Sequence, residues 1–211
     1  MATVTEHQDL TGSLTLNGEI FTCASGDGGA FWVKGGGSLN GFATFSGNET
    51  TATNGDGGAI FNQGIITLDS TLFENNSASI GVAPNGRGGA ICNAGNSTVT
   101  LTNTTFTNNT ARIGGAIYNA GTLNLENVDF TTASDSIYNE GALVTRGTIN
   151  AANTSLTTTK SFDNYAALTL GELNASVKLY KYSLTTSTSV QSLEVIKISG
   201  ARLEANCVNI H

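Results

Sequence analysis

The stretch that decides the fold is GGAIFNQGIITLDSTLFENN, at residues 57–76. A second version, GGAICNAGNSTVTLTNTTFTNN, follows at residues 88–109. Both run from Gly-Gly-Ala and an apolar residue to a Phe-x-x-Asn motif. A chain that matches itself at a nearly fixed spacing indicates a repeat architecture, in which each copy is one structural unit.

The two motifs recur together along the first two thirds of the chain. From the first glycine of a copy to its phenylalanine there are 16 to 18 residues each time. The fourth copy keeps Phe130 but has Ala133 at the asparagine position, and a decayed copy follows at residues 137–141. We assign structural roles in the repeat to Gly28, Gly29, Gly57, Gly58, Gly88, Gly89, Gly114, Gly115, Phe45, Asn48, Phe73, Asn76, Phe106 and Asn109.

Apolar residues between the motifs alternate with polar ones. Ile66 and Leu68 precede Phe73, and Val99 and Leu101 precede Phe106. This i, i+2 spacing is typical of a β-strand with one buried face. The Asn-x-Gly that follows each first strand suits a tight turn. The sequence therefore predicts an all-β single domain, a right-handed parallel β-helix (β-solenoid) with three short strands per coil.

Stacked coils bring equivalent side chains into ladders. We predict four inward ladders, Ile60/Ile91/Ile117/Ile137, Ile66/Val99/Leu123/Leu143, Leu68/Leu101/Leu125 and Phe45/Phe73/Phe106/Phe130. A ladder of hydrogen-bonded amides is expected at a turn, from Asn62, Asn93, Asn119 and Asn139. Another column holds Trp32, Phe61, Tyr118 and Tyr138 together with Cys92. Facing inward, these residues are core; facing outward, they form an aromatic stripe suited to glycan or protein contact.

Composition changes near residue 160. Residues 1–159 hold 4 basic and 12 acidic residues, whereas residues 160–211 hold 5 basic and 4 acidic ones and lack both motifs. We therefore assign residues 1–159 to the repeat-bearing β-helix and residues 160–211 to irregular β coils and a C-terminal cap, which would cover the unpaired strand edges of a solenoid end.

Bulk properties exclude several classes of function. The net charge of −7 and the pI near 4.6 disfavour nucleic-acid binding. No apolar run reaches the roughly 18 residues of a membrane helix. The first residues, MATVTEHQDLTGSL, do not resemble a signal peptide, so an exported protein would contain this chain as a fragment or mature form. The three cysteines have no metal-binding spacing, and we expect buried thiols.

Asp27 and Asp56 are the candidate cation ligands. Both directly precede a Gly-Gly-Ala, so stacked coils would place them side by side, where two carboxylates bind a cation or share a proton. Alternatively, each carboxylate closes a glycine turn. Arg87 is expected one residue out of step with them. No catalytic or cofactor-binding residue, and no resident metal or cofactor, is predicted.

Over residues 26–141 the paired motifs resemble the repeats of the chlamydial polymorphic outer membrane proteins. The resemblance implies a β-helical autotransporter passenger, exposed at the cell surface or outer membrane or secreted, with an adhesin-like role toward a host-cell protein or glycan. The signal peptide and membrane barrel of that architecture are not found in this sequence. The ends of a solenoid also favour end-to-end self-association.

Two other functions fit a β-helix. A polysaccharide lyase or hydrolase would work with carboxylates such as Asp27 and Asp56, although fold alone says little about chemistry. Ice binding would need regular columns of threonine, which the repeats lack. We therefore expect an adhesin-like binding segment that contacts its partner through edge loops, rather than an enzyme.

Overall fold

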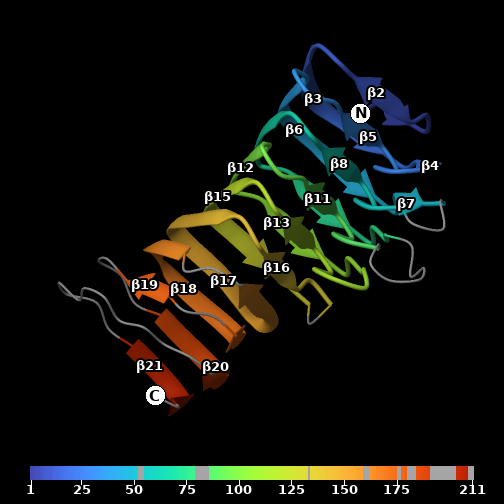
Figure 1. The fold of residues 1–211 in the computed structure, drawn as a ribbon. Helices are drawn as coiled ribbons and strands as arrows, with labels where there is room; N and C mark the ends of the chain where they lie inside the picture. The colour runs from blue at the N-terminus through green and yellow to red at the C-terminus, as the bar shows by residue number, and fades with distance from the viewer. Residues whose placement is uncertain are drawn as a thin grey trace.

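A computed structural model describes residues 1–208 except 52–54, 79–85, 133, 159–161, 175–176, 180–183 and 191–202. All its strand pairings are parallel, and no helix occurs among these residues. The strands wind into coils that stack along one axis from the N-terminal end to the C-terminal end (Figure 1). The prediction of an all-β parallel β-helix is confirmed. No helix in the described residues is long and apolar enough to cross a membrane.

Strands recur in the same order in each coil. β1 (Thr3–Val4) pairs with the end of β3 and so precedes the first complete coil, which contains β2 (Gln8–Leu10), β3 (Ser13–Phe21) and β4 (Ala24–Ser25). The repeats form β5 (Phe31–Val33), β6 (Ser38–Ser46), β7 (Glu49–Thr50), β8 (Ile60–Asn62), β9 (Ile65–Asp69), β10 (Leu72–Glu74), β11 (Ile91–Asn93), β12 (Thr98–Thr102), β13 (Thr105–Thr107), β14 (Ile117–Asn119) and β15 (Thr122–Phe130). Later coils contribute β16 (Ile137–Asn139), β17 (Ala142–Thr158), β18 (Phe162–Asn174), β19 (Val177–Leu179), β20 (Leu184–Val190) and β21 (Leu203–Val208).

The four predicted inward ladders are all confirmed. Strands pair residue for residue, so that Ile91 lies between Ile60 and Ile117. The phenylalanine ladder is the most regular, with successive rings stacked 4.8 to 5.0 Å apart from Phe45 to Phe130. These side chains are almost completely buried and form one continuous core along the axis.

The structure adds a coil that the motifs do not indicate. Strand β2 pairs with β5, and β3 pairs with β6, so residues 8–25 form a full turn before the first Gly-Gly-Ala. Phe21 extends the phenylalanine ladder, with its ring 5.1 Å from that of Phe45. This coil was missed because it contains neither repeat motif.

Three strands per coil are seen where β8, β9 and β10, and then β11, β12 and β13, follow each other. In β6 and β15 the second and third strands join into one nine-residue strand. The join bends at Gly41 and Asn127, which have positive φ values. A further short ladder follows the Phe-x-x-Asn motif, from β4 and β7 to the bridges at Ser77 and Thr110.

The first asparagine ladder is confirmed. The Nδ2 of Asn62 donates to the Oδ1 of Asn93 at 2.8 Å, Asn93 donates to Asn119 at 2.6 Å, and Asn119 donates to Asn139 at 2.6 Å. Each amide satisfies the next, so a column of buried polar side chains runs along the axis without unpaired groups.

The asparagines of Phe-x-x-Asn form a second, unpredicted ladder. Asn48 donates to Asn76 and Asn76 to Asn109, each at 2.8 Å. Asn109 then donates to the buried carboxylate of Asp135 at 2.9 Å. Asp135 therefore takes the place that we had aligned with Ala133, a residue outside the described part. The shift arises because the loop after Phe130 is longer than in the earlier copies.

The two glycines of each Gly-Gly-Ala have different roles. Gly57 has a φ of 69°, which side-chain-bearing residues rarely adopt. Gly58 lies so close to the next coil that a Cβ would be 2.0 Å from the carbonyl oxygen of Gly89. The motif thus joins a left-handed turn to a close approach of two backbones.

Beyond β17, β18, β20 and β21 continue the parallel pairing in succession. The backbone between 162 and 208 therefore follows the same winding where it is described. The proposed division at residue 160, and the capping role of the tail, stay predictions.

Candidate functional site

The aromatic column faces outward. In β8 the neighbours of Phe61, Ile60 and Asn62, are completely buried, so the side chain of Phe61 lies on the opposite side of the strand. Trp32, Phe61 and Tyr138 are half-buried, whereas Cys92 and Tyr118 are buried by neighbours on the outside of the coil. This resolves the alternative that the sequence left open.

The rings of this column contact one another. Trp32 and Phe61 meet edge to face at 5.7 Å, and Tyr118 and Tyr138 stack at 5.9 Å. The Nζ of Lys34 lies 4.8 Å from the Trp32 ring, and the guanidinium of Arg87 lies 4.7 Å from the Tyr118 ring. Because Lys34 lies over the Trp32 ring and Arg87 over the Tyr118 ring, these two faces are already occupied by the chain itself.

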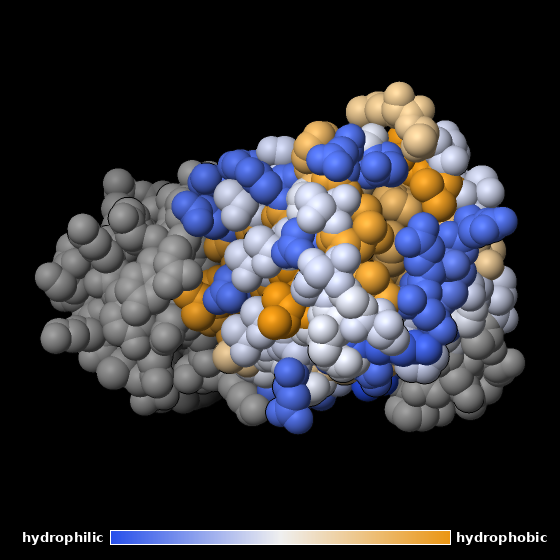
Figure 2. Space-filling view, turned by 90° about the horizontal axis from the view of Figure 1, so that it is seen from above, coloured by the Kyte–Doolittle hydropathy of each residue, from blue (hydrophilic) through white to orange (hydrophobic). Residues whose placement is uncertain are grey.

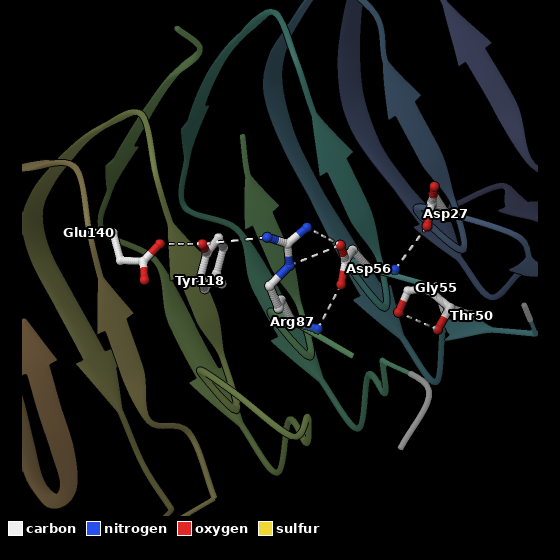
Figure 3. A network of polar contacts seen from close by, with 7 residues as sticks. All are labelled: Asp27, Thr50, Gly55, Asp56, Arg87, Tyr118 and Glu140. Atoms are coloured by element: carbon white, nitrogen blue, oxygen red, sulfur yellow. Dashed lines mark hydrogen bonds and ion pairs between the residues drawn. The ribbon is translucent and has the colours of Figure 1, made fainter. Parts of the chain in front are cut away.

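A line of polar contacts runs beside the aromatic column and crosses the coils (Figure 3). The Oδ1 of Asp27 accepts from the backbone N–H of Asp56 at 2.9 Å. The Oδ1 of Asp56 accepts in the same way from Arg87 at 2.9 Å, and its Oδ2 accepts from Nε at 3.0 Å and Nη2 at 2.5 Å. Both oxygens of Asp56 are therefore engaged by the chain itself.

Arg87 lies in step with the two aspartates, and the expectation of a one-residue offset was wrong. The N–H of Gly28 donates to the carbonyl of Asp56, and that of Gly57 donates to the carbonyl of Arg87. All three residues directly precede a Gly-Gly-Ala. An Asp-Asp-Arg column results, in which the guanidinium neutralises the carboxylate of Asp56, a side chain only 7% exposed.

The structure brings Asp27 and Asp56 together as the sequence predicts, but each carboxylate binds the next coil rather than facing its neighbour. In the described part of the chain, no three His, Cys, Asp or Glu side chains are grouped to hold a metal ion. Sequence reasoning missed the bridging role of Arg87; its place before Gly88 is the signal that would have shown it.

Arg87→Met should destabilise the chain by about 2 kcal/mol, because the buried carboxylate of Asp56 loses its charged partner. Urea unfolding followed by circular dichroism measures this. Arg112→Met is the matched control, because Arg112 is exposed, and its effect should stay within about 0.5 kcal/mol. When Asp56→Asn is added to Arg87→Met, the double variant should recover part of the stability lost in Arg87→Met. If Asp56→Asn had the same effect on the free energy of unfolding in the natural chain and in Arg87→Met, the pairing would be contradicted.

Two groups in or near the polar line resist ionisation. Burial, together with a hydrogen bond from the Tyr118 hydroxyl to Glu140 at 2.5 Å, raises the pKa of Tyr118 to about 12. Burial, and then the nearby Asp56 carboxylate, raise the pKa of Cys92 well above its ordinary value. Cys23 is also buried, and neither thiol forms a disulfide, as expected for these two cysteines.

These shifts predict a loss of stability at alkaline pH. Above about pH 9 the unfolded chain releases protons from Cys92 and Tyr118 that the folded chain retains, so the free energy of unfolding should fall from there toward pH 12. Urea midpoints between pH 7 and pH 11 measure the decline. In Tyr118→Phe, the urea midpoint should fall less steeply above pH 10 than in the natural chain. An unchanged slope would contradict the assignment of this decline to Tyr118.

The edge beside this line is where coil length varies most. Ser77 and Thr110 are equivalent, and so are Arg87 and Ile113. Between these fixed points lie nine residues, 78–86, in one coil and two, 111–112, in the next. The preceding coil also has extra residues at this edge, between Thr50 and Gly55. The hydroxyl of Thr50 donates a hydrogen bond to the carbonyl of Gly55 at 3.3 Å. Ladders on both sides stay in register, so the scaffold accepts insertions at this edge.

The model of the Chlamydia polymorphic membrane protein repeat matches residues 43–63, 70–94 and 103–120. The chain therefore carries three copies of a repeat similar to that of those proteins, as its motifs indicate. Neither curated proteins nor solved structures give a match to this chain. The matched segments contain β7, β8, β10, β11, β13 and β14 and also Arg87, whereas β9 and β12 lie between them.

Proposed function

We propose that this chain is a β-helical passenger segment displayed at a cell surface, where it holds a partner without chemical turnover, as an adhesin does. The observation that carries the proposal is the variation in coil length at one edge, where nine residues, 78–86, in one coil correspond to two, 111–112, in the next. Coils with residue-for-residue core pairing differ there by several residues, and loops on a rigid scaffold are the usual place for binding residues. The similarity to polymorphic membrane protein repeats supports the surface location.

The surface is compatible with such a role. On the face in Figure 2, hydrophobic residues appear as separate patches among hydrophilic and neutral ones. Among the described residues, the exposed large hydrophobic side chains are Met1, Phe42 and Ile65. Recognition would therefore rest on hydrogen bonds and shape more than on a broad apolar patch. The contacts of Asp27 and Asp56 also favour binding over hydrolysis, because Arg87 engages both oxygens of Asp56.

Retention of the purified, fluorescently labelled chain on cultured epithelial cells tests this proposal. The control is a variant in which residues 79–85, SIGVAPN, are placed in shuffled order, so that the composition and length of the segment stay the same. We expect saturable binding of the natural chain and a reduction of at least several-fold in the shuffled variant. Equal retention of both proteins would contradict a binding role for this edge.

A further inference from the structure

A pocket of about 380 Å³ lies at a different corner of the coil, where the second strand turns into the third. It is lined by Asn103, Thr105, Asn127 and Asp129. Thr105 and Asp129 pair in the β13–β15 ladder, so the pocket is built from the same two positions of adjacent coils. Its volume is within the range of about 300–1,000 Å³ that is common for small-ligand sites.

Backbone conformation forms two walls of the pocket. Asn103 and Asn127 have positive φ values of 47° and 53° at the turn. Asn103 is fixed further, because its N–H donates to the carbonyl of Glu126 at 3.0 Å and its Nδ2 donates to Asp69 at 2.9 Å. A ligand would thus meet polar groups that the stacked coils already hold in place, which lowers the entropic cost of binding.

The lining has one kind of chemistry. All four side chains are polar and can form hydrogen bonds with a ligand, and none is apolar or cationic. Asp129 is exposed, and its carboxylate has no hydrogen bond or ion pair with any side chain that the structure describes. With Asp69 and Glu126 nearby, the corner repels anions. What fits is a neutral ligand with many hydroxyl groups, since a carboxylate accepts two neighbouring O–H donors and amides and hydroxyls satisfy the others.

We propose that this pocket is a glycan-binding subsite that holds one unit of a neutral oligosaccharide, with the Asp129 carboxylate as its principal acceptor. The inference rests on the proposed binding function and adds a ligand class and a location to it. Because the lining contains a single carboxylate, the pocket lacks the pair that glycoside hydrolysis uses, and it would hold the sugar without cleaving it.

The test is binding of the 211-residue chain to an array of neutral mammalian oligosaccharides, followed by titration of the best one by isothermal calorimetry. Asp129→Ala should weaken binding roughly ten-fold or more, because it removes a charged acceptor. Thr105→Val keeps the shape and removes the hydroxyl, and should weaken binding about three-fold. Glu74→Ala is the control, since Glu74 lies on the neighbouring β10 outside the pocket, and its affinity should be unchanged.

The outcomes separate this proposal from the wider one. Glycan binding that Asp129→Ala leaves unchanged, with the folded state verified by circular dichroism, overturns the pocket and leaves the adhesin-like role standing. Retention on cells with no array signal overturns the ligand class. Retention that the shuffling of residues 79–85 abolishes and Asp129→Ala preserves also overturns the subsite. Loss of array binding in Asp129→Ala and Thr105→Val, but not in Glu74→Ala, supports it.

Discussion

Phe73→Ala should destabilise the chain by about 4 kcal/mol, a large part of the stability of a single domain. Phe73 is completely buried between Phe45 and Phe106, with ring distances of 4.8 and 5.0 Å. Truncation removes both ring contacts and leaves a cavity in the middle of the ladder, which the stacked coils cannot close without losing their pairing. Urea unfolding monitored by circular dichroism at the strand band measures the loss.

Phe42→Ala is the matched control. Phe42 lies in β6, the strand of the ladder residue Phe45, but is 45% exposed, so its removal should cost no more than about 1 kcal/mol. If the two substitutions had similar effects, the phenylalanine ladder would not be the main source of stability. A broad, multiphasic transition in Phe73→Ala would instead show that the coils on either side of the gap unfold separately.

Much of this fold was predictable because a coil cannot bury its own apolar face. Ile60, Phe73 and their equivalents must align for the stack to form, so the motif spacing fixes strand order and register together. The outward column was not predictable in the same way. Phe61 and Ile60 are both apolar, and only the alternation of the strand, once its start is known, shows which of them faces the core.

The candidate sites depended on side chains that lie outside the two repeat motifs. Arg87 occupies the position at which the two earlier coils have aspartate, and only the stacking of the coils shows that its guanidinium pairs with the Asp56 carboxylate. The pocket at Thr105 and Asp129 lies at the bend formed by Asn127, which has a positive φ. The composition of this segment does not show that Asn127 adopts this conformation. Residues of this kind are found from the sequence only after the coil register is known.

Asn76→Ala should also be strongly destabilising, by about 4 kcal/mol. The Nδ2 of Asn76 donates to the carbonyl of Phe45 at 2.9 Å and to Asn109 at 2.8 Å. Its Oδ1 accepts from the backbone N–H of Asn48 at 3.0 Å and from the Nδ2 of Asn48 at 2.8 Å. Alanine leaves four buried groups without this partner, and each orphaned group costs about 1–3 kcal/mol, although the costs are not additive. Asn75→Gly is the control, because Asn75 is exposed with a φ of 55° that glycine accepts.

A carboxylate is tolerated at the end of this asparagine ladder but not in its middle. At its end, the carboxylate of Asp135 meets only donors, from Asn109 to one oxygen and from Asn108 and Thr132 to the other. In the middle, Asn76→Asp would place a carboxylate against the acceptor oxygen of Asn109 and the carbonyl of Phe45. We therefore expect Asn76→Asp to be at least as destabilising as Asn76→Ala at pH 7 and to recover partly below pH 5, where protonation restores one donor. A variant as stable as the natural chain at pH 7 would show that the amides are not aligned as a donor-to-acceptor series.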